Sequence, residues 1–357
     1  MLTLELITPV DDDRPVFITG NFNDWTVRDE RYRMMRVKEG YYRYTFHEIP
    51  DLGGERFEYK YVKGGWDGEE LSEEGLPRMN RILEVVTGKV VDLVPQWKRH
   101  ATWYDPKYYP DIQVISRRFH LPQLRRRRRI SVLLPWDYHT SNKRYPVLYL
   151  QDGQNLFEED APFGTWGVDK HLAALAQRGK GDLIVVAIDH GGHERIKEFM
   201  PYDTSKWGEG LGKEYARFLA ETLKPYIDKN YRTLPDRQYT GIGGSSMGGL
   251  ISIYAGILFP LIYSKFLIFS PSLWAAPNIY REQLDFAALP HTRIYLFAGG
   301  KEGAGMVENA KHLTQVLIER CPKRNCTRLE IDPEGQHNEA RWGQEFPKAV
   351  QWLFFEQ

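Results

Sequence analysis

A glycine-rich stretch holds the residue with the clearest potential for chemistry. It reads Gly241-Ile-Gly-Gly-Ser-Ser-Met-Gly-Gly-Leu250, and the pattern G-x-S-x-G fits it only with Ser246 at the centre. This spacing is typical of a nucleophile elbow, a sharp strand-to-helix turn whose strained serine needs neighbours without bulky side chains. The apolar stretch Met247–Leu258 that follows predicts a buried helix. We therefore predict that Ser246 is a nucleophile.

A base and an acid would have to work with this serine. After Ser246 the sequence contains only His291, His312 and His337. His337 follows the last predicted strand, Thr327–Ile331, in a polar loop, and loops at strand ends hold catalytic groups in parallel sheets. Because His291 precedes a strand and His312 lies in a predicted helix, we predict that His337 is the base.

Glu302 is the predicted acid. It follows the predicted strand Arg293–Phe297 in a glycine-rich turn, and chains with this elbow place the acid between the serine and the histidine. Its carboxylate would accept the Nδ1–H of His337 and stabilise the imidazolium that forms when the histidine takes the serine proton. Asp332 and Glu334 stay open as alternatives, although their loop would have to fold back to reach the histidine.

The elements that must position these residues are predicted to form an α/β domain. From Tyr145 onward, apolar strand-like runs alternate with helical stretches, which indicates a mostly parallel sheet with helices on both faces. The runs are residues 145–150, 182–188, 238–242, 265–269 and 293–297, and the helical stretches lie near 167–178, 211–228, 247–258 and 304–320.

The first 95 residues have a different pattern. Short strand-like runs separated by turn residues predict a small all-β sandwich of the immunoglobulin-like type. Prolines and aromatic residues without periodicity at 94–111 suit a linker, and we place the boundary near Trp97, between a domain at 1–97 and a domain at 98–357. The strand-like runs are residues 3–7, 16–19, 42–46, 57–61 and 81–85.

Several motifs of the second domain are those of a known family. Residues 110–357 resemble the esterase family that includes esterase D, enterochelin esterases, feruloyl and acetyl-xylan esterases and mycolyltransferases. The resemblance implies an α/β-hydrolase fold and a Ser–acid–His triad that needs no cofactor. Besides the elbow, the motifs are Tyr149-Leu-Gln-Asp-Gly153, Ile188-Asp-His-Gly-Gly192 with Arg195 and Glu198, Ser270-Pro-Ser-Leu-Trp274, Gly300-Lys-Glu302 and Gly335-Gln-His337.

A tetrahedral intermediate would need donors for its oxyanion. The backbone N–H of Met247, directly after the predicted nucleophile, is one expected donor. The other is expected from the loop after the strand at 146–150. In the family that this chain resembles, the residue after the Asp-Gly pair supplies it, which implies Gln154.

The N-terminal region resembles starch- and glycogen-binding modules. The resemblance implies that Trp25, Lys60, Trp66 and Asn80 contact a sugar, with the indole faces stacked on the pyranose and the lysine and asparagine bonded to its hydroxyls. The alternative is a module that acts only as a docking lid, with Trp25 in the core of the sandwich. The matching stretches are Gly20-Asn-Phe-Asn-Asp-Trp25, Phe57-Glu-Tyr-Lys60, Gly64-Gly-Trp66 and Met79-Asn-Arg81.

Charge and hydropathy argue against nucleic acid and membranes as partners. Lys plus Arg equals Asp plus Glu at 48 each, so no overall field attracts polyanions. The run Arg125–Arg129 adjoins a predicted strand and suits a solvated strand end better than a nucleic-acid patch or localisation signal, although it could attract an anionic substrate. The mainly apolar run Leu250–Tyr263 is too short to span a bilayer. Because the start lacks a basic, apolar leader, we expect a cytoplasmic protein.

Two further features bear on metals and redox state. Cys321 and Cys326 are the only cysteines, and two free thiols are favoured over one local bridge. His190 and His193 lie in a glycine turn without a clear third ligand, so we expect no metal and no cofactor. The sequence leaves open whether the protein is a monomer or a homodimer.

The predicted function is that of a serine carboxylic-ester hydrolase with an acyl-enzyme intermediate. Its expected substrate is a small acyl or aryl ester of the acetyl or feruloyl type, including one linked to a carbohydrate. Three alternatives stay open: hydrolysis of a siderophore trilactone of the enterochelin type, acyl transfer to a sugar acceptor, and a glycan-binding protein with an inactive hydrolase domain.

Overall fold

In the computed structural model the chain forms two compact units, Met1–Pro106 and Lys107–Gln357. Within the described residues, no helix is both long and apolar enough to cross a membrane. The structure describes residues 1–9, 14–48, 52, 56–73, 75–84, 87–98, 104–157, 161, 163–282, 284–303, 305–321 and 326–356.

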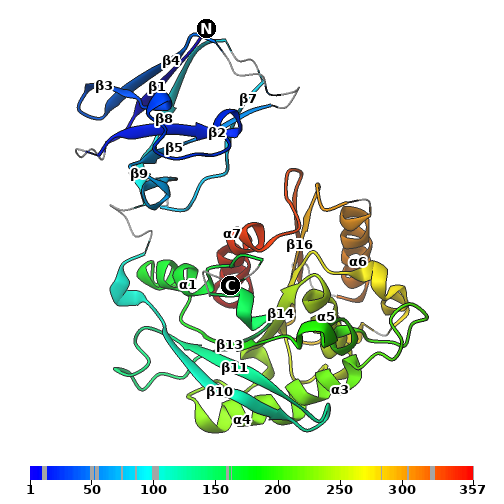
Figure 1. The fold of residues 1–357 in the computed structure, drawn as a ribbon. Helices are drawn as coiled ribbons and strands as arrows, with labels where there is room; N and C mark the ends of the chain where they lie inside the picture. Colours follow the sequence, from blue (N-terminus) through cyan, green and yellow to red (C-terminus); the bar gives the residue numbers. More distant parts are fainter. Residues whose placement is uncertain are drawn as a thin grey trace. The chain divides into compact units, whose positions relative to one another are not determined.

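The strands of the N-terminal unit form sheets of four, three and two strands (Figure 1). Their orders are β3-β4-β1-β8, β2-β5-β7 and β6-β9. The five predicted runs fall on β1, β2, β4, β5 and β7, and Val85, the predicted end of the last run, lies outside the described residues. The bounds are β1 (Leu2–Ile7), β2 (Val16–Gly20), β3 (Met35–Lys38), β4 (Tyr41–Phe46), β5 (Phe57–Lys63), β6 (Glu70–Leu71), β7 (Arg81–Leu83), β8 (Gly88–Leu93) and β9 (Gln96–Trp97).

One apolar core joins the four-stranded and three-stranded sheets. Alternate residues of β1 point into it together with alternate residues of β5, as the two-residue period of strands requires. Trp97 is fully buried in this core, and its indole N–H donates to Thr8 Oγ1 at 3.0 Å. Trp97 therefore belongs to the N-terminal unit. Of the predicted linker at 94–111, residues 99–103 lie outside the described residues.

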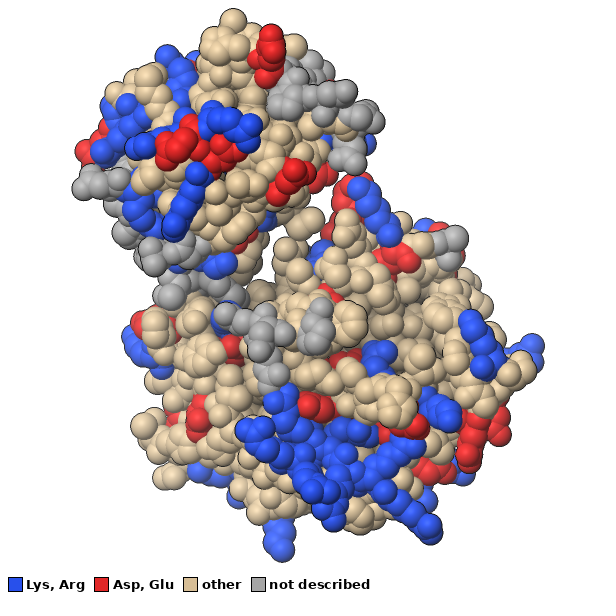
Figure 2. All heavy atoms as spheres, in the orientation of Figure 1, with Lys and Arg blue, Asp and Glu red and all other residues tan. Residues whose placement is uncertain are grey.

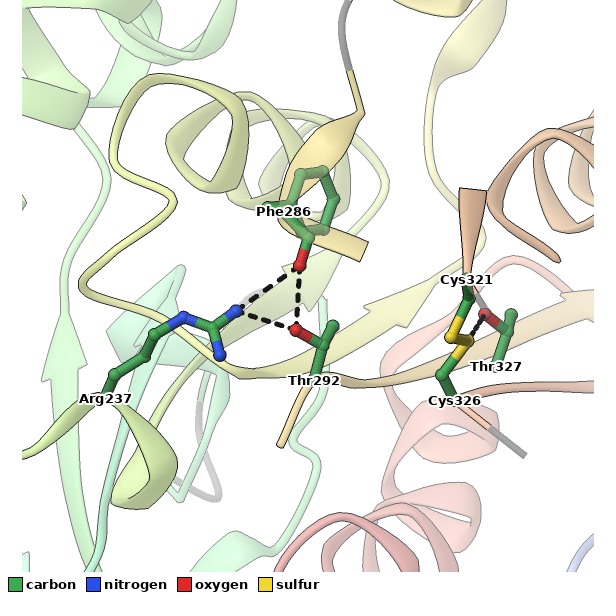
Figure 3. Close-up of a disulfide and its surroundings, with 6 residues drawn as sticks. All are labelled: Arg237, Phe286, Thr292, Cys321, Cys326 and Thr327. Carbon is green, nitrogen blue, oxygen red and sulfur yellow. Dashed lines mark hydrogen bonds between the residues drawn. A yellow bond between two sulfur atoms is a disulfide. The ribbon is translucent and has the colours of Figure 1, made fainter. Parts of the chain in front are cut away.

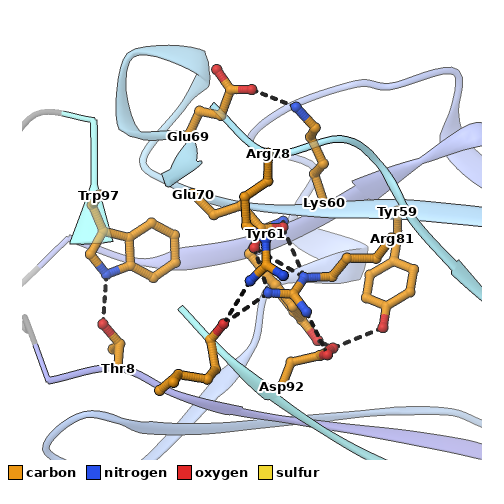
Figure 4. Close-up of polar contacts among 11 residues, drawn as sticks. Thr8, Tyr59, Lys60, Tyr61, Glu69, Glu70, Arg78, Arg81, Asp92 and Trp97 are labelled. Carbon is orange, nitrogen blue, oxygen red and sulfur yellow. Dashed lines mark hydrogen bonds and ion pairs between the residues drawn. The ribbon is translucent and has the colours of Figure 1, made fainter. Parts of the chain in front are cut away.

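A polar cluster lies beside this core (Figure 4). The Arg81 guanidinium bonds to Glu70, whose side chain is fully buried, at 2.7 Å and to Asp92 at 2.6 Å. The hydroxyls of Tyr59 and Tyr61 both donate to Asp92 Oδ2 at 2.8 Å. Burial lowers the pKa of Arg81, but the bonds and charges of Glu70 and Asp92 outweigh this effect, so its pKa lies above the ordinary value.

Removal of the cation from this cluster is expected to destabilise the N-terminal unit. Arg81→Met leaves the buried Glu70 carboxylate without its partner, and breaking a buried pair in this way costs about 3–5 kcal/mol of unfolding free energy. Urea unfolding, with hydrogen exchange of the β5 and β7 amides to locate the effect, measures the loss. Arg33→Met, which breaks an exposed pair with Glu30, is the control and should cost no more than about 1 kcal/mol. Equal losses in the two variants would contradict this account of the cluster.

The C-terminal unit is built on an eight-stranded sheet with the order β10-β11-β13-β12-β14-β15-β16-β17 (Figure 1). β12 to β17 run parallel, and the β10–β11 hairpin is antiparallel at one edge. The predicted run 238–242 begins two residues too early, because residues 237–239 form a turn of 3-10 helix. The bounds are β10 (Asp111–Leu121), β11 (Arg126–Leu134), β12 (Val147–Gln151), β13 (Ile184–Ile188), β14 (Thr240–Ser245), β15 (Lys265–Phe269), β16 (Arg293–Gly299) and β17 (Thr327–Asp332).

Helices cover both faces of this sheet. Leu148 and Leu150 of β12 pack in one core with side chains of α1 and α7, whereas Val147 and Tyr149 pack in the other with side chains of α3, α5 and α6. Both faces of the central strands are therefore buried, as their continuous apolar runs predict. The helices are α1 (Val168–Gln177), α2 (Arg195–Phe199), α3 (Gly212–Arg217), α4 (Lys224–Asn230), α5 (Met247–Leu258), α6 (Met306–Arg320) and α7 (Glu339–Val350).

The expectation of free thiols is wrong, because Cys321 and Cys326 form a disulfide (Figure 3). α6 ends at Arg320 and β17 begins at Thr327, so the short connection brings the two Cα atoms to 6.5 Å, within bridging distance. The sequence alone could not decide this, since the pairing depends on how the helix and the strand meet. The same view shows Arg237, whose guanidinium donates to the Thr292 hydroxyl at 2.7 Å.

Candidate active site

The predicted nucleophile lies in a strained turn between β14 and α5. Ser246 has φ 57° and ψ −122°, a conformation that non-glycine residues rarely adopt. The glycines on either side are required by close approach: a Cβ on Gly244 would lie 3.0 Å from the carbonyl carbon of Gly248, and a Cβ on Gly248 would lie 3.1 Å from Gln151 Cβ. The Ser246 N–H donates to the Phe269 carbonyl at 2.9 Å, which ties the turn to β15. The G-x-S-x-G spacing thus fits a turn with no room for larger residues.

Glu302 and His337 are in direct contact. His337 Nδ1 lies 2.8 Å from Glu302 Oε2, the side chain of Glu302 is fully buried, and that of His337 is 36% exposed. The other carboxylate oxygen, Oε1, accepts from the Gly299 N–H at 2.8 Å and from the Ser270 hydroxyl at 2.6 Å. Because an ionised carboxylate only accepts, these bonds imply that Nδ1 carries the proton and leave Nε2 as an acceptor.

The two alternative acids bind elsewhere. Asp332 bonds to Arg341 at 2.6 Å, and Glu334 pairs with Lys301 at 2.5 Å. Burial raises the pKa of Asp332, but the Arg341 guanidinium and neighbouring backbone N–H groups more than offset this, so its pKa is lowered. Among the described residues, Glu302 is the carboxylate that contacts His337.

The hydroxyl of Ser246 contacts a second serine. Its Oγ lies 3.1 Å from Ser272 Oγ, and the Ser272 N–H donates to the Ser246 carbonyl at 3.0 Å. Across the described part of the chain, no hydrogen bond joins Ser246 to His337. Catalytic hydrogen bonds often tighten only when substrate binds, so the prediction for these two residues does not depend on this bond.

The predicted oxyanion donors lie on adjacent segments, because β12 and β14 are neighbours in the sheet. Met247 is the first residue of α5, where N–H groups have no partner within the helix, and its N–H adds to the positive end of the helix dipole. Gln154 lies in a 3-10 turn, Gly153–Asn155, after β12, and its side chain accepts from the His190 N–H at 3.0 Å.

The loop that carries Gln154 is fixed by a buried ion pair. Arg195 donates to both carboxylate oxygens of Asp152, at 2.6 and 2.7 Å, and Asp152 has a positive φ of 58°. A bidentate pair of this kind holds a carboxylate in one orientation. The loop also packs closely against the elbow, since a Cβ on Gly248 would lie 3.1 Å from Asp152 Oδ2.

The arginine run is only in part a solvated strand end. Arg126 and Arg128 form ion pairs with the buried Glu198, and Arg129 pairs with Asp189 at 2.8 Å. Arg125 and Arg127 are exposed. Figure 2 shows basic side chains gathered on the face of the C-terminal unit that carries the β10–β11 hairpin.

The two histidines of the glycine turn make separate contacts. His190 Nδ1 accepts from the Gly192 N–H at 2.9 Å, and His193 lies 3.3 Å from Glu194. In the ranges that the structure describes, no group of three or more His, Cys, Asp or Glu side chains could hold a metal ion.

Of the four predicted sugar contacts in the N-terminal unit, the two tryptophans are neighbours, whereas the lysine and the asparagine each pair with a different glutamate. The rings of Trp25 and Trp66 lie 6.5 Å apart at 32°, Trp66 is 40% exposed, and Trp25 is half-buried outside the apolar core. Lys60, on the outward side of β5, pairs with Glu69 at 2.6 Å (Figure 4). Asn80 donates to Glu58 at 2.9 Å.

Sequence reasoning gave no role to several residues that contact the site. Ser270 and Ser272 lie in a motif that marks the esterase resemblance, which could have drawn attention to them. Trp342 donates to Ser270 Oγ at 2.9 Å from α7, and no spacing in the sequence indicates that contact. Trp274, which the sequence places in a segment that could line a substrate cleft, lies in the 3-10 turn Leu273–Ala275, and its ring is 5.7 Å from that of Trp207 at 59°.

The sheet and its helices have the arrangement of the α/β-hydrolase fold, and comparison with solved structures agrees. A ferulic acid esterase superposes with a TM-score of 0.53 at 19% identity, over 69% of this chain and 98% of that one. The family follows from the sequence: residues 122–353 match the model of the family described as "Putative esterase". The chain belongs to that family and is a carboxylic ester hydrolase.

Two curated relatives come from Bacillus subtilis. The uncharacterized protein YbbA is 26% identical over 244 residues, which are 64% of this chain and 92% of YbbA. The ferri-bacillibactin esterase BesA is 28% identical over 202 residues, or 48% of this chain and 66% of BesA. This chain therefore spans slightly less than two thirds of BesA.

Proposed function

We propose that this protein is a serine esterase that works through a covalent acyl-enzyme, with Ser246 as nucleophile, His337 as base and Glu302 as acid. The observation that carries the proposal is the 2.8 Å bond between Glu302 and His337, which are 35 residues apart in the chain. The strained turn that presents Ser246 supports it, because backbone strain concentrates at functional sites.

The reaction would proceed in two halves. Ser246 Oγ attacks the ester carbonyl carbon while His337 Nε2 takes its proton, and the N–H groups of Met247 and Gln154 bind the oxyanion. The intermediate collapses, the alcohol leaves with the proton from His337, and the acyl group stays on the serine. Water then attacks the acyl-enzyme by the same route and releases the acid.

An aryl or small acyl ester of the feruloyl or acetyl type, free or carbohydrate-linked, is the substrate we propose. An aromatic pair supports the aryl part of this choice. Trp274, whose ring lies tilted beside that of Trp207, is 59% exposed and follows Ser272 by two residues, a separation that spans at most about 7 Å. An exposed indole this close in the chain to a residue that touches Ser246 suits a flat aryl group.

A panel of esters tests the proposal. It comprises p-nitrophenyl acyl esters, methyl ferulate, acetylated xylan and a catecholate trilactone, assayed for product release. Highest kcat/KM on methyl ferulate or an acetyl ester supports the proposed substrate class. Preference for the trilactone favours the siderophore alternative, which the sequence similarity to the ferri-bacillibactin esterase supports. Product that shifts from acid to new ester when a sugar alcohol competes with water indicates acyl transfer.

For the N-terminal unit we propose an immunoglobulin-like sandwich, resembling starch- and glycogen-binding modules, that binds α-glucan. The neighbouring Trp25 and Trp66 rings support this proposal, since exposed indole faces stack on sugar rings. Lys60 and Asn80 would bond to sugar hydroxyls. The docking-lid alternative needs no sugar, but its placement of Trp25 in the core does not fit the half-buried position of that residue outside the core.

Trp66→Ala is expected to weaken retention of the protein on immobilised α-glucan and to leave hydrolysis of small esters intact. The substitution removes an indole that is 40% exposed and stacks with no part of the apolar core. Affinity electrophoresis in amylose measures retention. Trp136→Ala, at an indole of equal exposure in the C-terminal unit, is the matched control. If the wild-type protein is not retained at all, the sugar-binding proposal fails.

A further inference from the structure

Two hydrogen bonds run behind the Glu302–His337 pair, and they link it to Trp342 through Ser270. We propose that Ser270 and Trp342 are positioning residues that orient the Glu302 carboxylate and thereby set the tautomer of His337. The inference rests on the proposed function, because it assigns roles to residues that act through the proposed acid and base.

The chemistry of the donors fixes the direction of each bond. An indole N–H can only donate, so Trp342 Nε1 donates to Ser270 Oγ at 2.9 Å. The single hydroxyl proton of Ser270 is then directed to Glu302 Oε1, 2.6 Å away. With the Gly299 N–H also on Oε1, the other oxygen, Oε2, faces His337 Nδ1. The order of donors leaves His337 as the Nδ1–H tautomer, whose Nε2 can accept a proton.

Trp342 also contacts the base directly. Its ring meets the His337 imidazole edge-on, with centroids 4.8 Å apart at 83°, and it is only 3% exposed. His337 directly precedes Asn338, the residue that caps α7, and Trp342 lies in the first turns of that helix. One side chain thus restrains the imidazole ring and directs the Ser270 proton.

Ser270 is held in a conformation that its residue type disfavours. Its φ is 44°, its side chain is fully buried, and its N–H donates to the Phe297 carbonyl at 2.8 Å. Two residues later, Ser272 contacts Ser246. The segment 270–272 therefore touches the proposed acid at one end and the proposed nucleophile at the other, and strain of this kind persists where the surroundings enforce it.

Two substitutions test the proposal without disturbing the fold. Ser270→Gly removes the hydroxyl at a φ that glycine adopts freely, and Trp342→Phe removes the indole N–H but keeps a ring. Each is expected to lower kcat, by up to about 100-fold for Ser270→Gly, with little change in KM, because the base loses its fixed orientation. The acid limb of the pH profile of kcat/KM should move to higher pH, because a carboxylate with fewer donors stabilises the imidazolium more strongly. A purely structural defect would not move this limb.

The double variant Ser270→Gly/Trp342→Phe separates a connected pair from two independent effects. If Trp342 acts mainly through Ser270, the double variant loses little more activity than Ser270→Gly alone. Trp352→Phe, at a buried tryptophan packed on Tyr295, is the control and should keep wild-type kcat and pH profile. Fully additive losses, or an unchanged pH limb in Ser270→Gly, would overturn the proposal.

A measurement that needs no activity distinguishes failure of this inference from failure of the proposed function. In proton NMR, the Nδ1–H of a hydrogen-bonded imidazole resonates at low field, and His337→Asn identifies the signal. The signal should be present in the wild type and should shift downfield in Ser270→Gly, because a carboxylate with one donor fewer is the stronger acceptor. An unchanged signal in Ser270→Gly refutes the inference, even if the protein hydrolyses esters. A protein without esterase activity that shows the expected shift refutes the function and keeps the positioning role.

Discussion

Ser246→Ala is expected to abolish ester hydrolysis, with a loss of at least about ten-thousandfold in kcat. The substitution removes the hydroxyl of the strained residue between β14 and α5, so the proposed acyl-enzyme cannot form. The residual activity of the variant is the rate that the oxyanion donors and substrate binding provide when water is the nucleophile. The assay is release of product from the best ester of the panel, measured in parallel with the wild type.

The neighbouring serine provides a matched control. Ser245→Ala changes the last residue of β14, a position that the G-x-S-x-G frame excludes as the nucleophile, and should keep most of the activity. Circular dichroism and the melting temperature verify that both variants fold. If Ser245→Ala loses the activity and Ser246→Ala keeps it, the motif frame is wrong. If neither the wild type nor a variant hydrolyses any ester, a glycan-binding protein with an inactive hydrolase domain becomes the leading reading.

Glu302→Gln is expected to keep the fold and to lose about a thousand- to ten-thousandfold in kcat. The side-chain amide that replaces the carboxylate can adopt only one orientation that satisfies its neighbours. Two donors, the Gly299 N–H and the Ser270 hydroxyl, face the position of Oε1 and require the amide oxygen there. The amide NH₂ must then face His337 Nδ1, which forces the proton onto Nε2 and blocks that atom as a base.

The alternative acids supply the controls for this experiment. Glu334→Gln alters a carboxylate that is paired with Lys301 at the surface, and it should retain near-wild-type kcat. Asp332→Asn weakens the bond to Arg341 and should act mainly on stability. Near-wild-type turnover of Glu302→Gln would move the role of acid to Asp332 or Glu334.

Much of the sheet could be predicted because burial on both faces leaves a continuous apolar signature. The run 184–188 is buried at every position and was predicted within residues 182–188. The elbow was predictable for a different reason, since close approach leaves no room for side chains at two fixed positions, Gly244 and Gly248. The apolar runs and the glycine spacing each involve residues that are close together in the chain, so both can be recognised in the sequence.

Contacts between distant segments were not predictable in the same way. Spacing alone left three carboxylates open as the partner of His337, and only the fold separates Glu302 from Asp332, which Arg341 engages. Trp342 and Ser270 are 72 residues apart, so their hydrogen bond has no trace in any motif. The disulfide was missed because the approach of Cys321 to Cys326 depends on where α6 ends.

The arginines of the edge hairpin have a consequence for how copies of this protein meet. β10 is an outer strand of the eight-stranded sheet, and an outer strand offers unpaired backbone groups to any other chain. Arg117 and Arg118 are exposed on β10, and Arg125 and Arg127 are exposed across the hairpin. Two copies that approached edge to edge would bring these like charges together before a backbone ladder could form. Repulsion between the guanidinium groups thus opposes continuation of the sheet from one molecule into the next, and with it aggregation.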